Sequence, residues 1–175
     1  MKRDLDKTKA VIAYIIDYFQ RNDLLKYLGK VKLVKILWYA DREFMYKYFK
    51  PITNLEYRKM PQGPLPSNFD SILKSMEEED IIKSYKIDKL GGYTQHSFFC
   101  LKEPNLDDFT SQEINVLDKV IAQTYKKTAQ QLSNQTHDEL WESIGLGKVM
   151  PLESVFLQDV IPATIEDVDG SNQHT

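Results

Sequence analysis

The 175-residue sequence contains a single cysteine, Cys100, and only seven glycines and seven prolines. One cysteine excludes an intramolecular disulfide framework and a zinc site built from several cysteines. So few glycines and prolines exclude a collagen-like or low-complexity chain. The composition is otherwise that of an ordinary globular protein, with 42% hydrophobic and 28% charged residues. The length suits one domain with a substantial buried core.

Signals for membrane insertion or export are also missing from the sequence. No stretch approaches the ~20 consecutive apolar residues that a membrane-spanning helix needs. The apolar run 10–16 is separated from the basic start by Asp4, Asp6 and two lysines, and no small-residue cleavage site follows it. We therefore expect an amphipathic first helix in a cytoplasmic protein that does not contact a membrane.

The net charge of −3 is small and argues against a generally basic nucleic-acid-binding protein. The charges are nevertheless unevenly distributed along the chain. Residues 1–60 contain 14 Lys+Arg and 7 Asp+Glu, whereas residues 61–175 contain 9 and 19. We interpret this asymmetry mainly as internal pairing between a basic central helix and acidic later segments, with surplus acid available to a basic partner.

The spacing of apolar residues predicts the main elements. Residues 6–21 carry apolar residues on one helical face. Residues 30–50 carry them nearly all round, which predicts a buried central helix that ends where Lys50 precedes Pro51. Strand-like segments at 82–87 and 93–101 flank a Gly-Gly loop and predict a β-hairpin.

Turn and capping residues predict the remaining elements. Residues 51–66 are expected to be irregular, because three prolines and a glycine lie near their end. Pro64 or Pro66 suits the first turn of a helix that runs to about Met76 or Glu79. Thr110, Thr128 and Thr136 are each followed three residues later by Glu or Gln, the capping-box pattern. They predict helices over about 111–126, 129–134 and 137–144.

These elements predict a fold that is mainly α with a small β-hairpin (α+β), a single compact helical domain around a buried central helix. We place this domain at residues 1–162. Residues 163–175 are acidic and polar and are expected to form a tail that frays.

No group of residues predicts catalysis, a metal site or a cofactor. His96 and Cys100 would lie ~13 Å apart along a strand, too far to bind one ion together. Asp41 lies in the most apolar helix, and a buried carboxylate must be paired or hydrogen-bonded. We expect Asp41 to anchor a loop or a helix start through backbone N–H groups. A small hydrolase would instead require Asp41 or His137 to meet a second titratable group in a cleft.

A DNA-binding regulator is the main alternative function, since a helix followed by a hairpin is typical of winged-helix domains. The hairpin lysines are opposed by nearby acids, whereas a phosphate-binding surface needs clustered cations. The basic side chains of the central helix, listed next, could instead extend along a buried helix and pair with acids in the second half of the chain. The better basic candidates lie on and around the central helix: Lys26, Lys30, Lys32, Lys35, Arg42, Lys47, Lys50, Arg58 and Lys59.

Three segments together resemble the Panacea domain, the SocA-like antitoxin family formerly grouped with the phage-associated protein GepA. They are the central-helix motif at 32–41, the segment 52–66 with its Gly-Pro-x-Pro loop, and the Ser-x-x-Thr-His segment within 132–141. The resemblance covers most of residues 5–150. The motif positions, for which we expect a role in partner binding or in the motif's structure, are Lys35, Asp41, Tyr57, Pro61, Gly63, Pro64, Thr136, His137 and Trp141.

The resemblance implies an antitoxin of a bacterial or phage toxin–antitoxin pair, which neutralises a protein toxin encoded next to it by direct contact. One family member also delivers its toxin to the ClpXP protease, so a proteolytic adaptor role is a further implication. No catalytic residue or cofactor is implied. We expect Asp41 to tie the Gly-Pro loop or the Thr136 cap to the central helix. Gln62 replaces a common aromatic residue, and Asp80 replaces a common glycine, which predicts a less regular helix end.

Overall fold

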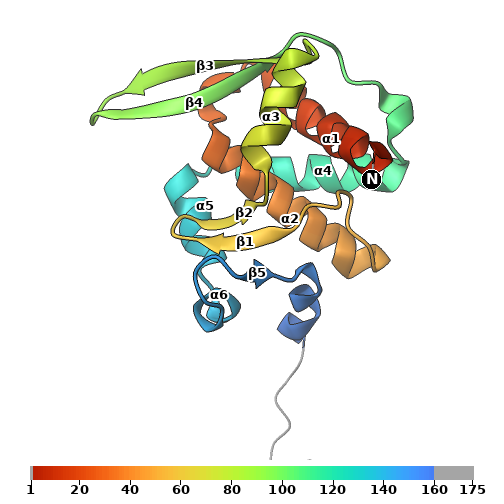
Figure 1. Cartoon of the computed structure of the whole chain (residues 1–175), viewed down its shortest axis with the longest axis vertical. Helices are drawn as coiled ribbons and strands as arrows, with labels where there is room; N and C mark the ends of the chain where they lie inside the picture. Colours follow the sequence, from red (N-terminus) through yellow and green to blue (C-terminus); the bar gives the residue numbers. More distant parts are fainter. Residues whose placement is uncertain (1, 160–175) are drawn as a thin grey trace, which may run out of the picture.

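The computed structural model describes residues 2–159, which form a helical domain with two small antiparallel sheets (Figure 1). The predicted α+β class is confirmed. The predicted boundary at 162 and the acidic tail lie outside the described residues. The α-helices are α1 (Lys2–Arg21), α2 (Lys30–Tyr48), α3 (Phe69–Glu78), α4 (Ser111–Thr124), α5 (Ala129–Thr136) and α6 (Glu139–Ser143), and the 3-10 helices are η1 (Leu25–Tyr27), η2 (Leu106–Asp108) and η3 (Leu152–Asp159). The strands are β1 (Tyr57–Met60), β2 (Gly63–Pro66), β3 (Ile82–Lys89), β4 (Tyr93–Cys100) and β5 (Val149–Met150).

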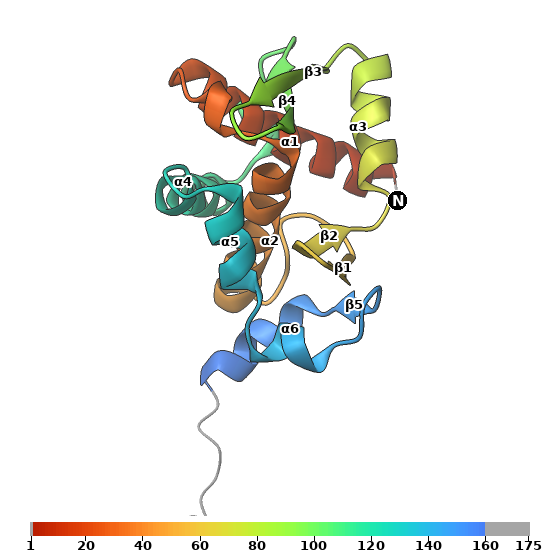
Figure 2. The same ribbon diagram turned by 90° about the vertical axis from the view of Figure 1, so that its left-hand side faces the viewer.

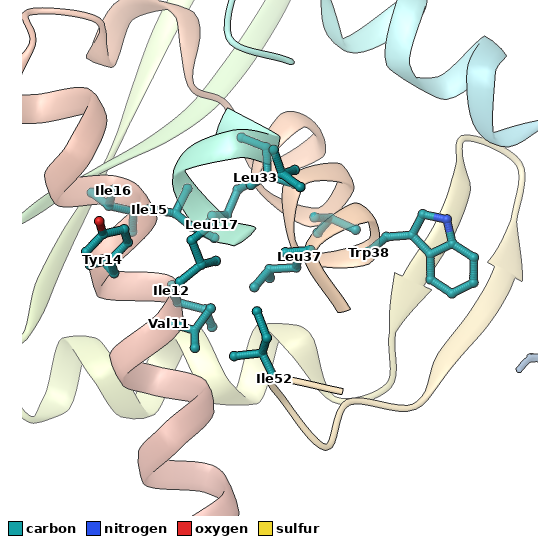
Figure 3. Packing of buried hydrophobic residues seen from close by; sticks show 14 of the residues in the cluster. Val11, Ile12, Tyr14, Ile15, Ile16, Leu33, Leu37, Trp38, Ile52 and Leu117 are labelled. Atoms are coloured by element: carbon teal, nitrogen blue, oxygen red, sulfur yellow. The ribbon is translucent and has the colours of Figure 1, made fainter. Parts of the chain in front are cut away.

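Helix α2 is the central helix of the domain, as its all-round apolar pattern predicts. Figure 3 shows Leu33 and Leu37 of α2 facing the apolar stripe of α1, with Leu117 of α4 beside them. Trp38 points the other way, toward β1, where its ring lies 5.0 Å from the ring of Tyr57. Each such buried side chain stabilises the fold by ~1.5–3 kcal/mol relative to an exposed one. Because its side chains point in both directions, α2 connects the two sides of the core.

Residues 57–66 form a β-hairpin, and the expectation of an irregular loop was wrong. Strands β1 and β2 pair in register from Tyr57 opposite Pro66 to Met60 opposite Gly63, and β5 adds to the other edge of β1. The backbone N–H of Lys59 donates to Lys148 O on the β5 side, so its partner Pro64 faces it without a ladder bond. Because hydrogen-bonded and non-hydrogen-bonded pairs alternate in an antiparallel ladder, Pro66 opposite Tyr57 also lies in a non-hydrogen-bonded pair. An edge strand accepts prolines there, because no N–H is needed.

Helix α3 begins at Phe69, so Pro64 and Pro66 lie in β2 and not in the first turn of a helix, contrary to the prediction. The end of α3 is regular although Asp80 replaces a glycine. Asp80 N–H donates to Glu77 O and Ile81 N–H donates to Met76 O, the pair of bonds of a Schellman motif. Asp80 adopts the required left-handed conformation, with φ +54°. The predicted irregular helix end is therefore wrong.

Two of the three predicted helix starts are confirmed. Thr110 and Thr128 form complete capping boxes with Glu113 and Gln131. The third is wrong: Thr136 is the last residue of α5, and Asp138 caps α6 by accepting from the backbone N–H of Trp141. Aspartate serves as well as threonine at this position, so the two overlapping signals could not be separated locally.

The β3–β4 hairpin is confirmed, with Ile82 paired to Cys100 and Lys89 to Tyr93. It extends beyond the helical body in Figure 1, while the base of β4 lies against α1 and η1. Cys100 is buried there, and its thiol donates to Ala13 O. Among residues 2–159, none of the helices combines the length and apolar character needed to cross a lipid bilayer.

Candidate functional site

Three motif positions from distant parts of the sequence meet where the β1–β2 turn lies between α2 and α5. The Lys35 ammonium donates to the backbone carbonyl of Gln62. A Cβ atom added to Gly63 would lie 2.3 Å from Lys35 Nζ and 2.4 Å from Thr136 Oγ1. Gly63 also has φ +102°, a conformation that other residues rarely adopt. We call Lys35, Gly63 and Thr136 the motif junction.

A second contact extends the motif junction toward α6. Lys59 of β1 donates to the carbonyl oxygens of Trp141 and Ile144 at 2.6 and 2.7 Å, and its ammonium lies 3.7 Å from the centre of the Trp141 ring. The rings of His137 and Trp141 stack at 3.8 Å. Within the described part of the chain, His137 Nε2 and Trp141 Nε1 are buried without a hydrogen-bond partner. Lys59 thus connects the β1–β2 hairpin to α6 by donating to carbonyl groups at the end of that helix.

Asp41 anchors the chain that follows α2. Its Oδ1 accepts from the backbone N–H groups of Ile52 and Thr53 at 3.0 and 2.8 Å, and its Oδ2 accepts from the hydroxyls of Thr53 and Tyr57. Asp41 is only 1% exposed, and this burial raises its pKa to about 6, against the lowering effect of the four hydrogen bonds. The expected anchoring through N–H groups is therefore present. The anchored segment is 52–57, however, whereas Lys35 holds the Gly-Pro loop.

The predicted pairing with acids is wrong for the buried cations of the central region, which are bonded to carbonyl and hydroxyl oxygens. Four cations are buried there, namely Lys32, Lys35, Arg42 and Lys59. Lys32 donates to Tyr125 O at the end of α4, and Arg42 donates to Ser154 Oγ of η3. The last carbonyls of a helix lack internal partners and carry partial negative charge, so an ammonium satisfies them without a carboxylate. The more accessible members do form ion pairs with acids, such as the half-buried Lys30 with Asp70 and the exposed Lys47 with Glu43.

The burial of Lys35 predicts that the free energy of unfolding changes with pH in the alkaline range. Desolvation lowers the pKa of Lys35 to about 8, below the ~10.4 of an unfolded lysine. Between these values the unfolded chain binds more protons than the folded chain, so stability rises with pH, by up to ~3 kcal/mol for this group. Because burial also lowers the pKa of Lys32 to about 8, we expect Lys35→Met to reduce the rise in urea-unfolding titrations from pH 7.5 to 10.5 by the share of Lys35. The exposed Lys74→Met serves as the control, and an equal pH dependence in both variants would contradict the prediction.

The remaining sequence-predicted positions divide between interior and surface. Gly63, Pro64 and Thr136 are buried, His137 and Trp141 are half-buried, and Pro61 is exposed at the hairpin turn. Lys59 was missed as a junction residue. A strand starting at Tyr57 would have placed Lys59 on the same inward face, but the prolines that follow concealed the strand.

The site offers no arrangement for the hydrolase hypothesis. The oxygens of Asp41 are occupied within the core, and the His137 ring is stacked on Trp141. Burial raises the pKa of Cys100 to about 12, which disfavours the thiolate form that a nucleophile needs. Within residues 2–159, no three His, Cys, Asp or Glu side chains are placed to bind one metal ion.

Two surface cavities lie away from the motif positions. One, of about 720 Å³, lies between the start of α1, the 54–56 segment and the start of α3. The other, of about 340 Å³, lies between α2, α4 and α5, with Tyr39 and Gln135 in its wall. None of the nine motif positions lines either of these cavities, although Tyr39 and Gln135 belong to two of the three motif segments.

Comparison with known proteins gives one match. The family model described as antitoxin SocA-like, Panacea domain, matches residues 33–142, which is more than half of the chain. The matched region starts in α2 and ends in α6, so it contains the motif junction and the Asp41 anchor. No curated protein and no solved structure matches the chain.

Proposed function

Since the chain belongs to the SocA-like antitoxin family of the Panacea domain, we propose that it neutralises a cognate protein toxin by direct contact and without catalysis. The toxin would be encoded next to it. The observation that carries this proposal is the convergence of Lys35, Gly63 and Thr136 from three segments inside the matched region.

The construction of the motif junction supports a binding module rather than an enzyme. Its polar groups are turned inward, and they connect α2, the β1–β2 hairpin and α5 to one another. A domain stiffened in this way presents its surface with little conformational entropy to lose, which favours tight protein binding. Occlusion of the toxin by contact is therefore the mechanism we propose. Delivery to a ClpXP-type protease would be an additional step, visible as a shorter half-life of the toxin when antitoxin and protease are both present.

The DNA-binding alternative gains little from the structure. Of the hairpin lysines, Lys89 donates to the carbonyl of Lys26. The end of α3, which precedes the hairpin, carries Glu77, Glu78 and Glu79, and acids repel phosphate. On the central helix, Lys32, Lys35 and Arg42 are buried. We therefore keep DNA binding only as an outcome of the experiment below.

The proposed function is tested by expressing the adjacent gene alone and together with this chain. We expect growth arrest in the first case, relief in the second, and co-purification of the two proteins as a complex of fixed stoichiometry. A harmless neighbour, or one that does not co-purify, would contradict the proposal. A salt-sensitive shift of the chain's own promoter DNA, without a protein complex, would favour the regulator instead.

A further inference from the structure

Three exposed side chains and the half-buried Phe156 form an aromatic and aliphatic cluster where the end of α2 meets η3. Phe49, directly after α2, is 79% exposed, and its ring stacks on Phe156 of η3 at 5.5 Å. Tyr46 lies 6.3 Å from Phe156 and is 45% exposed, and Leu157 is 63% exposed. We call Tyr46, Phe49, Phe156 and Leu157 the Phe49 patch. In both views α2 and η3 lie side by side, away from the β3–β4 hairpin (Figures 1 and 2).

The backbone of Phe49 makes this exposure more informative. Phe49 caps α2 in the left-handed conformation, with φ +57° and ψ +26°. The turn itself is required, because Pro51 prevents the helix from continuing and residues 52 and 53 must reach Asp41. Glycine or asparagine makes such a turn with less strain than a bulky side chain. The fold therefore needs the turn at this position but does not need a phenylalanine.

Two local preferences are thus violated by one residue, since Phe49 is both strained and largely exposed. Such combined violations concentrate at functional sites, where the strain is retained for another purpose. Aromatic side chains are also over-represented among the few residues that dominate binding between proteins. The other non-glycine residues with positive φ beside helix ends, Asp23, Asn68 and Asp80, place polar side chains in solvent, as ordinary surface turns do.

The charges beside the patch define the partner that would fit it. Lys47 and Lys50 lie at and just after the end of α2, and residues 44–50 contain no Asp or Glu. Glu43 is already shared between Lys47 at 3.0 Å and Lys119 at 2.6 Å. The exposed Lys47 and Lys50 are the charges on the α2 side of the patch, while η3 carries the exposed Glu153 near its start. A complementary surface is apolar at its centre and carries carboxylates at its edge.

From these observations we propose that the Phe49 patch is the surface that binds the toxin, with Phe49 as its central anchor. This inference rests on the proposed antitoxin function and adds the binding face and the chemistry of the partner. The occupant is an apolar, carboxylate-rimmed surface of the toxin. Binding buries Phe49 and Leu157 and places the toxin's carboxylates beside Lys47 and Lys50.

The test compares two substitutions that relieve the same kind of backbone strain. Phe49→Gly removes the proposed anchor and relaxes the left-handed turn, whereas Asp80→Gly relaxes a left-handed turn outside the patch. We expect Phe49→Gly to weaken the Kd for the adjacently encoded protein by at least ~30-fold, with a urea midpoint equal to or above the wild type. Asp80→Gly should raise the midpoint and leave the Kd unchanged. Phe49→Leu, which keeps an apolar side chain, should retain most of the affinity.

Other results would overturn the inference in distinguishable ways. If the wild type does not bind the adjacent protein, the proposed function fails and this inference fails with it. If the wild type binds and Phe49→Gly binds equally well, only the patch assignment is wrong. Equal binding together with loss of a dimer would identify a second copy as the occupant, and equal binding with faster hydrogen exchange in residues 160–175 would identify that segment. A fall in the urea midpoint for both Phe49→Gly and Phe49→Asn would assign Phe49 a structural role.

Discussion

Replacing Gly63 by alanine is expected to destabilise the domain by ~3–5 kcal/mol, a large part of the total stability of an ordinary domain. The new Cβ would meet Lys35 Nζ at 2.3 Å and Thr136 Oγ1 at 2.4 Å. Lys35 could move only by giving up its bond to Gln62 O, and Thr136 is held by its own bond to Ser133 O. The substitution also forces alanine into a φ of +102°.

The matched control for this prediction is Gly91→Ala in the β3–β4 turn. Gly91 has nearly the same φ, +98°, but a Cβ added there would meet no atom of the described residues within 4 Å. Gly91→Ala should therefore lower the free energy of unfolding only by the conformational cost of the positive φ, ~1–2 kcal/mol. Urea unfolding of both variants measures the difference, which isolates the steric contribution of the motif junction. Equal losses in the two variants would mean that the junction relaxes without penalty.

Replacing Asp41 by alanine is the second change with a large expected effect, a loss of ~4–6 kcal/mol. Four donors, from Ile52, Thr53 and Tyr57, would remain buried without an acceptor. Each unsatisfied buried donor costs ~1–3 kcal/mol, and the removed side chain leaves a cavity in the core. Because segment 52–57 leads directly into β1, we also expect the β1–β2 hairpin to become more dynamic in hydrogen exchange.

The size of the Asp41 effect is separated from a general charge effect by two further variants. Asp41→Asn keeps one acceptor oxygen in nearly the same shape and should lose about half as much as alanine. Asp70→Ala removes an exposed carboxylate paired with Lys30 and should change stability by less than ~1 kcal/mol. The free energies of unfolding should therefore rank wild type, Asp70→Ala, Asp41→Asn and Asp41→Ala in decreasing order. Similar losses for Asp41→Ala and Asp70→Ala would refute the anchoring role.

The features that were predictable from sequence depend on residues close together in the chain. The capping boxes at Thr110 and Thr128 require groups three residues apart, and the β3–β4 hairpin requires two strand patterns beside Gly91 and Gly92. The central position of α2 follows from apolar residues on all of its faces. The anchoring role of Asp41 follows from the cost of burying a carboxylate, although its partners could not be named in advance.

The features that sequence could not provide depend on backbone groups of distant segments. Carbonyl oxygens accept from Lys32, Lys35 and Lys59, and because every residue has a carbonyl, no sequence pattern marks the acceptor. The prolines of β2 concealed a strand that pairs with β1 alone, while β5 pairs with the other edge of β1.

The sequence by itself determined the helical class, the central helix, one hairpin and the membership of the chain in its family, because these follow from local periodicity, capping and motif order. Only the tertiary structure decided why residue 63 must be glycine, where the buried lysines find their acceptors, and that Phe49 is exposed in a strained turn. The physical reason is that these properties depend on which atoms the fold brings within contact distance. The charge asymmetry illustrates this: acids were the expected partners, but for the buried lysines of the central region helix ends and turns supply the oxygens.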